Sequence, residues 1–317
     1  MPSRARVARI HWAVTFAVSR SHCPNRSCPL AWKLASRKRS SMAPVAREEF
    51  TLENGLRVTV APLAGAGSVT TLVRYRVGHR NDPDGYRGLA HFTEHMTFHG
   101  GRHAPQGVIH LLEDVGVDAF NGVTSNDATV YYAVGSPAAL DRMLWVERER
   151  MGFTLDHTRD DALARELPAL IEEHRGRMES RAVSRLRGFI DEALFPAGHP
   201  LRDTEERVAD LEAVRARDVQ WFFQRWYRPD NAHLVVSGAV DPAAVRAQVT
   251  RYFADVPSRG ARPPRWRAAP LAVTSARTLR VQAGVGRPSL RVIWAAPGGC
   301  DPQSADLDLV ASLLSRR

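Results

Sequence analysis

The sequence lacks a long apolar run, holds few cysteines and has almost no lysine beyond its N-terminal part. No stretch approaches about 18 consecutive apolar residues, which excludes a transmembrane helix. The 3 cysteines among 317 residues exclude a disulfide-stapled scaffold. Lysine ends at Lys38, so the rest of the chain has no lysine for a phosphate-binding loop or a Schiff base. The Gly-x-Ser-x-Gly motif of serine hydrolases is also absent from the sequence.

The remaining composition is typical of a soluble globular protein, with 44% hydrophobic and 25% charged residues. A net charge of +10 suggests a nucleic-acid partner, but its location argues against one. Residues 1–41 contain nine of the 44 Lys and Arg residues and no acid, so 35 basic residues face 34 acidic ones elsewhere. We therefore expect a protein without a nucleic-acid partner, in either the cytoplasm or the periplasm.

Residues 1–45 form a basic extension that differs in composition from the rest of the chain. A short apolar run after a basic start is compatible with a signal peptide, and the acid-free, Arg-rich composition with an organellar transit peptide. A third interpretation is a non-native start, with Met42 opening the protein just before its first strand.

From Glu48 onward, apolar patterns alternate between strand and helix periods, which predicts an α+β fold with a mixed, largely antiparallel sheet. Gly65 and Gly67 between the first two strand segments indicate a hairpin. The expected strands are Phe50–Ala61, Ser68–Val77, Val117–Phe120, Ala128–Val134 and Ala232–Ala239. The expected helices are Leu89–Phe98, Pro105–Val115, Pro137–Met151, Thr158–Met178 (kinked at or starting from Pro168), Ser184–Leu194, Ala216–Trp226 and Pro242–Phe253.

Domain boundaries follow from a change in composition after this series. Residues 46–256 are expected to form one domain, and 257–276 a Pro/Arg-rich linker. Residues 277–317 are expected to be the incomplete start of a second, similar domain, because they are too few to form a domain of their own. Its expected elements are strands Thr278–Gln282 and Ser289–Trp294 and a helix Ala305–Leu314, in which Leu307, Leu309, Val310 and Leu313 would form an association surface.

Residues 91–95 form the pattern His-x-x-Glu-His inside the first expected helix. At about 100° per residue, His91, Glu94 and His95 emerge from one helix face. Two imidazoles one turn apart can share a tetrahedral Zn²⁺, and the carboxylate between them can take a proton from a metal-bound water. By chance this pattern occurs in about a few per cent of such chains, and the alternative is a helix with ordinary surface or core histidines.

A third ligand has to come from elsewhere, and the helix that contains Glu166, Glu172 and Glu173 offers carboxylates. Glu166 and Glu173 are seven residues apart and therefore share a helix face. One can bind metal while the other supports a metal-bound histidine. The alternative is that these acids form an exposed charged face.

Several segments, in this order, resemble the M16 family of inverted-motif zinc peptidases, which includes pitrilysin, insulinase and mitochondrial processing peptidase. The resemblance covers about Glu48 to Val256, the catalytic N-terminal domain of that family. The segments are Gly88–Met96 with the His-x-x-Glu-His pattern, Asp118–Thr124 followed by Asp127, Thr129, Tyr131 and Tyr132, the acidic pairs Arg165-Glu166 and Glu172-Glu173, and Trp226–Ala232.

The resemblance implies one Zn²⁺ per chain and a defined set of site residues. These are His91, His95 and Glu173 as zinc ligands, Glu94 as the general base, Glu166 as a carboxylate behind a ligand and Asn121 beside the substrate, with Glu172 competing with Glu173. Family members continue into a full second domain that closes over the first and contributes side chains toward the substrate, whereas this sequence contains only the start of one.

We therefore expect a zinc-dependent metalloendopeptidase that hydrolyses peptides or small proteins. The alternative is an incomplete or non-catalytic partner subunit, in a homo- or hetero-oligomer with a chain that supplies a complete second domain. A nucleic-acid binder that uses the basic extension is the weakest interpretation, because such binding would be independent of the His-x-x-Glu-His pattern.

Overall fold

The structure is a computed structural model that describes residues 46–155, 158–180, 184–258, 260–264 and 304–315, with four single residues between 278 and 293. The chain divides into two compact units. The larger unit comprises Ser40–Ser180 and Gly198–Pro264, and the smaller unit Met1–Arg39, Arg181–Ala197 and Arg265–Arg317.

A six-stranded sheet, in the order β1-β2-β6-β3-β5-β4, forms the centre of the larger unit within its described residues. Strands β2 and β6 pair in parallel, and the other neighbouring strands pair antiparallel. The α+β fold with a mixed, largely antiparallel sheet is thus confirmed. The strands are β1 Glu48–Thr51, β2 Arg57–Pro62, β3 Val69–Tyr75, β4 Val117–Thr124, β5 Thr129–Gly135 and β6 Ala232–Gly238.

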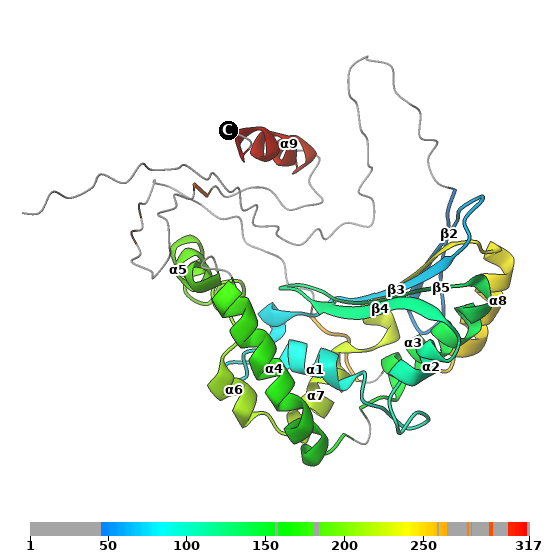
Figure 1. Cartoon of the computed structure of the whole chain (residues 1–317), viewed down its shortest axis with the longest axis horizontal. Helices are drawn as coiled ribbons and strands as arrows, with labels where there is room; N and C mark the ends of the chain where they lie inside the picture. The colour runs from blue at the N-terminus through cyan, green and yellow to red at the C-terminus, as the bar shows by residue number, and fades with distance from the viewer. Residues whose placement is uncertain are drawn as a thin grey trace, which may run out of the picture. The chain divides into compact units, whose positions relative to one another are not determined.

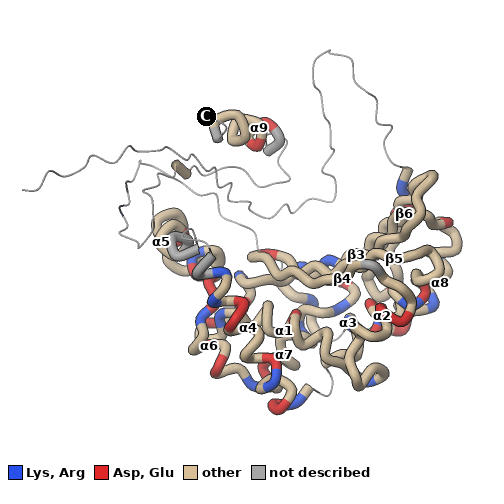
Figure 2. Tube along the Cα trace, in the orientation of Figure 1, with Lys and Arg blue, Asp and Glu red and all other residues tan. Residues whose placement is uncertain are grey.

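Helices α1, α3, α4 and α7 lie on one side of this sheet (Figure 1). Alternate strand residues point into the core beneath them, and in β3 Val69, Val73 and Tyr75 are fully buried. The helices are α1 Leu89–Met96, α2 Ile109–Glu113, α3 Leu140–Gly152, α4 Asp160–Ser180, α6 Val208–Ala213, α7 Ala216–Trp226 and α8 Pro242–Phe253, with 3-10 turns η1 His79–Asn81, η2 Pro137–Ala139 and η3 Pro229–Asn231. Acidic and basic residues lie next to one another along α4 (Figure 2).

The expected hairpin around Gly65 and Gly67 is wrong, because β6 lies between β2 and β3 in the sheet. Strand β6 pairs along both of its edges, with β2 on one side and β3 on the other. The turn that does form a hairpin is Asn54-Gly55, where Gly55 has φ +91°, and it divides the expected long first strand into β1 and β2.

Several element boundaries also differ from the sequence expectations. Helix α2 is shorter than expected, β4 extends four residues further, and α6 was not expected from the pattern. Helix α4 continues on both sides of Pro168, so a helix start at that residue is wrong. Pro168 is the ninth residue of α4 and lies on its exposed side, where water can hydrogen-bond the carbonyl that lacks an amide partner.

In the smaller unit the structure describes two helices, α5 Ser184–Leu194 and α9 Ser304–Ser315. The expected strands Thr278–Gln282 and Ser289–Trp294 fall outside the described residues, apart from single positions. Helix α9 matches the expected C-terminal helix and exposes Leu309, Val310, Leu313 and Leu314. Among the described helices, none combines the length and the apolar character needed to cross a bilayer.

Candidate metal centre

Helix α1 is fixed at its start by a buried carboxylate and a glycine. Asp82 accepts hydrogen bonds from the backbone N–H groups of Gly88, at 2.9 Å, and Ala90, at 2.7 Å. Gly88 has φ +103°, and a Cβ there would lie 2.7 Å from the Leu211 side chain. Both features hold the first turn of α1 against η1 and α6, so the side chains one turn later have a defined position.

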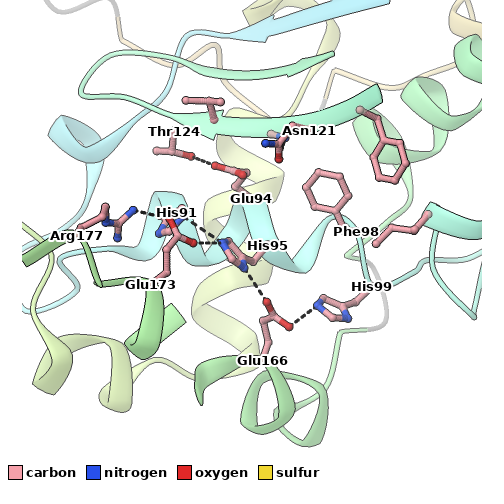
Figure 3. A pocket seen from close by; sticks show the side chains of 14 residues that line it. His91, Glu94, His95, Phe98, His99, Asn121, Thr124, Glu166, Glu173 and Arg177 are labelled. Atoms are coloured by element: carbon pink, nitrogen blue, oxygen red, sulfur yellow. Dashed lines mark hydrogen bonds and ion pairs between the residues drawn. The ribbon is translucent and has the colours of Figure 1, made fainter. Parts of the chain in front are cut away.

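The two histidines of the pattern converge as their spacing predicts. The Nε2 atoms of His91 and His95 lie 3.1 Å apart, on the side of α1 that faces β4 and α4 (Figure 3). His91 is buried and His95 is partly exposed. Both Nε2 atoms thus point at one position at the floor of a cleft.

A carboxylate from α4 completes this cluster. One oxygen of Glu173 lies 3.7 Å from His91 Nε2 and the other lies 3.4 Å from His95 Nε2. The hydrogen bond from His95 and the nearby charges of His91 and Arg177 lower the pKa of Glu173, so the carboxylate stays ionised. Glu172, in contrast, is exposed and pairs with Arg175 at 2.5 Å.

Glu166 lies two turns earlier on the same face of α4 and supports His95 from behind. Its oxygens lie 2.7 Å from His95 Nδ1 and 2.6 Å from His99 Nε2. Burial alone would raise the pKa of Glu166, but the hydrogen bonds from both histidines lower it to about 2. Burial would lower the pKa of His95, whereas its bonds to Glu166 and Glu173 raise it to about 9. The histidine therefore sits between two anionic carboxylates.

Glu94 points from α1 toward strand β4, away from α4 (Figure 3). The hydroxyl of Thr124 donates a 2.6 Å hydrogen bond to Glu94 Oε2. Gly122 permits this approach of helix and strand, because a Cβ there would lie 2.5 Å from Glu94 Oε1. Glu94 is 5% exposed and therefore keeps one defined position beside the two imidazoles.

These side chains line a cleft of about 670 Å³ between α1, α4 and β4. Strand β4 is at the edge of the sheet, and the exposed Asn121 on it reaches the cleft. Four apolar side chains also line the cleft, namely Phe98, Ile109, Phe120 and Val123. All the site residues expected from the sequence, except Glu172, therefore border one cleft.

Sequence reasoning missed two residues that touch the site. Thr124 is part of the segment Asp118–Thr124 that resembles the family, but its contact with Glu94 depends on how α1 packs against β4. Glu206 lies 3.0 Å from His91 Nδ1, yet in the sequence it is one acid among the charges of Asp203–Arg207. The signal that points to it is chemical: a metal-binding imidazole needs a partner for its other nitrogen.

The cluster fits a tetrahedral zinc ion. Two ligand atoms at about 2.0–2.1 Å from tetrahedral zinc are about 3.3–3.4 Å apart. The two Nε2 atoms lie 3.1 Å apart, and one Glu173 oxygen lies 3.4 Å from His95 Nε2 while the other lies 3.7 Å from His91 Nε2. The ligand atoms of His91, Glu94 and His95 also lie within 4.8 Å of one another, but Thr124 occupies one Glu94 oxygen. The donor set of two imidazoles and a carboxylate suits zinc.

The fold and the site together are those of an α+β protein with a candidate His/Glu metal centre beside the edge of its sheet. Comparison with known proteins identifies the family. A model described as Insulinase (Peptidase family M16) matches residues 59–175, and one described as Peptidase M16 inactive domain matches residues 213–317. The chain belongs to the M16 peptidase family.

Individual relatives are proteases that are longer than this chain. Zinc protease PqqE of Helicobacter pylori is 30% identical over 214 residues, which cover 65% of this chain and 46% of that protein. Insulin-degrading enzyme of Drosophila melanogaster is 27% identical over 256 residues, covering 74% and 26%. The crystal structure of a protease from Helicobacter pylori has a TM-score of 0.64 and 28% identity, covering 70% of this chain and 54% of that one. The chain thus spans less than half the length of these two curated relatives.

Proposed function

We propose that this chain is a zinc-dependent endopeptidase whose metal ligands are His91, His95 and Glu173. One observation carries the proposal: two imidazole nitrogens and a carboxylate converge at the separations of a tetrahedral site, in a cleft beside a sheet edge. Family membership supports a peptidase, and relatives named zinc proteases support the choice of metal.

The chain's own residues would supply the acid–base chemistry. Zinc, when bound, polarises the carbonyl of the scissile peptide bond and lowers the pKa of a water molecule. Glu94 would accept the proton of the attacking water and pass it to the leaving amine, as a general base and then a general acid. Thr124 holds one Glu94 oxygen, and a carboxylate oxygen of Glu94 lies within 4.8 Å of a ring nitrogen of each histidine.

The substrate would bind along β4. This edge strand has no strand partner on its outer side among the described residues, so an extended peptide can add to it through backbone hydrogen bonds. Asn121 and Thr124 lie on the part of β4 that borders the cleft (Figure 3). We propose that Asn121 contacts the peptide close to its scissile bond. A peptide or small protein with an extended segment would be the substrate.

We also propose the division into domains that the sequence predicts. Residues 46–256 would form the catalytic domain, 257–276 a linker and 277–317 the start of a second M16 domain, preceded by the basic extension 1–45. The model described as Peptidase M16 inactive domain matches residues 213–317, so its match begins before the proposed linker and includes β6 and α8 of the larger unit.

A second candidate function is that of a partner subunit with little activity of its own. The observation that favours it is the similarity to a protein named as a subunit, mitochondrial-processing peptidase subunit beta of Saccharomyces cerevisiae, which is 26% identical over 231 residues. The intact cluster of metal-binding and basic side chains favours the enzyme.

Zinc stoichiometry and activity test the proposed function. The purified chain should hold one Zn²⁺. Glu173→Gln should bind zinc at least about 10-fold more weakly, because a neutral amide replaces an anionic ligand. Loss of a residue that only supports a ligand already weakens metal binding by about 10–100-fold. Glu172→Gln, its exposed neighbour, is the matched control and should keep the parent affinity. Elemental analysis and chelator competition measure both.

Peptide cleavage completes the test. A chelator should abolish cleavage of a fluorogenic peptide, and added zinc should restore it. A parent chain that binds no zinc would overturn the proposed function. Weak zinc binding by Glu172→Gln together with parent-like binding by Glu173→Gln would overturn the ligand assignment alone.

A further inference from the structure

Glu206 gathers four basic side chains from three different elements around one buried carboxylate. Its Oε1 lies 3.0 Å from His91 Nδ1 and 3.7 Å from His79 Nε2, and its Oε2 lies 3.6 Å from His174 Nδ1. The guanidinium of Arg177 also donates to Oε2. Glu206 is 8% exposed, so these partners take the place of water around it.

Contacts with the residues just before α1 hold the segment that carries Glu206 in place. Arg87, just before α1, receives a hydrogen bond on its carbonyl from the backbone N–H of Arg207. The N–H of Arg87 donates to Asp210 at 2.9 Å, and Leu211 packs against Gly88. The segment that carries Glu206 is thus tied to the start of the helix that carries His91.

The electrostatic surroundings keep Glu206 anionic. Arg177 donates a hydrogen bond to one Glu206 oxygen, and the imidazoles of His79 and His91 lie within 3.7 Å of the other, so basic groups surround the carboxylate. An anionic acceptor at Nδ1 favours the His91 tautomer that carries its proton on Nδ1. The Nε2 atom of that tautomer has a lone pair available for a metal.

We propose that Glu206 is a positioning residue that fixes the tautomer and ring orientation of His91 and makes its Nε2 a stronger zinc ligand. This role rests on the proposed function of the site. With Glu206 in this role, the Nδ1 atom of each histidine contacts a separate carboxylate, Glu206 for His91 and Glu166 for His95.

Arg177 connects this arrangement to the third ligand. It donates a 2.8 Å hydrogen bond to Glu173 and another to Glu206. The side chains that hold His91 and Glu173 are therefore coupled through one guanidinium. Loss of the Glu206 charge would release Arg177 from one of its two carboxylates and loosen both ligands.

Zinc affinity of Glu206→Gln is the central measurement. Carboxylates behind a metal-bound histidine typically contribute about 10–100-fold to metal affinity, so the dissociation constant of Glu206→Gln should rise by that factor. Glu212→Gln, on the exposed face of nearby α6, is the matched control and should bind zinc like the parent. Chelator competition on the full chain measures all three proteins.

Thermal unfolding separates this role from a purely structural one. A positioning role predicts that zinc raises the melting temperature of Glu206→Gln less than that of the parent. A structural role predicts lower melting temperatures with and without zinc, and an unchanged shift on zinc binding. Glu206→Asp is the second variant: it keeps the buried charge but withdraws the carboxylate by roughly 1.5 Å, so it too should bind zinc more weakly.

The outcomes distinguish this inference from the function on which it rests. If the parent binds one zinc and both Glu206 variants match its affinity, the positioning role is overturned and the proposed function stands. If the parent binds no zinc, the proposed function and this role both fall.

Discussion

At the scale of single residues, the same chemical group has different tasks because its neighbours differ. Glu94 and Glu173 are both carboxylates beside the same pair of imidazoles. Glu94 is buried and accepts a hydrogen bond from the Thr124 hydroxyl, which holds one of its two oxygens in place. Glu173 is half-exposed and lies between His95 and Arg177, two cationic or proton-donating groups that keep it anionic. The anionic carboxylate of Glu173 is therefore suited to bind a metal ion, and the hydrogen-bonded carboxylate of Glu94 is suited to act as a base.

The proposed base is tested by Glu94→Gln. This variant should keep its zinc but lose about 10²–10⁴-fold in kcat, because an amide does not accept a proton from water at neutral pH. KM should change little, since the glutamine keeps nearly the same shape. Steady-state cleavage of a fluorogenic peptide, alongside a zinc assay of the same sample, measures both quantities. Activity within a few-fold of the parent would show that another group is the base.

At the scale of helices and strands, local patterns predicted the elements better than their order. The spacing of His91, Glu94 and His95 required only one helix, and the structure places them on one face of α1. The order of the sheet depends on β6, which follows β5 by about a hundred residues and still separates β2 from β3. No pattern near Gly65 could signal that insertion, because it is set by pairing between distant strands.

The same distinction applies to the site. Glu166 and Glu173 share a face of α4, and that could be read from their spacing alone. The contacts of Thr124 and Glu206 could not, because each depends on how another element packs against α1. Spacing alone therefore groups residues that share an element, whereas the family resemblance brought α4 and Asn121 to the histidines of α1, and neither pointed to Thr124 or Glu206.

Helix α1 depends on Asp82, which leads to a prediction about the element itself. Asp82→Ala would leave the buried N–H groups of Gly88 and Ala90 without their acceptor. The variant should lose about 1–3 kcal/mol of unfolding free energy. Asp84→Ala is the control, since Asp84 is exposed and forms a surface ion pair with Arg87 worth about 0–1 kcal/mol.

Urea unfolding in the presence of a chelator measures this loss without a contribution from zinc. A smaller zinc-induced stabilisation in Asp82→Ala would show that the start of α1 also positions the histidines. Equal stability of Asp82→Ala and Asp84→Ala would contradict the role of Asp82 in fixing the helix.

At the scale of the whole molecule, metal binding and peptide cleavage make different demands. Every side chain of the proposed zinc site comes from the larger unit. Cleavage also needs the scissile bond to be held near attack geometry and the developing oxyanion to be stabilised. Among the described residues that line the cleft, Arg177 is paired with Glu173 and Glu206, and His99 is paired with Glu166. The cationic groups of the cleft are thus committed to organising the site.

We therefore expect this chain to bind zinc tightly but to cleave peptides slowly by itself, well below the roughly 10 s⁻¹ that is typical of enzymes. A second chain that carries a complete M16 inactive domain should raise kcat when it is added in trans, because it would enclose the peptide on the side opposite β4. Sizing chromatography and peptide cleavage, before and after the addition, measure association and rate. The Glu94→Gln variant, treated in the same way, should stay inactive and so shows that the gain arises at this site. A monomer that cleaves peptides at about 10 s⁻¹ without a partner would contradict the expectation, and would mean that one wall of the cleft is enough to hold a peptide for attack.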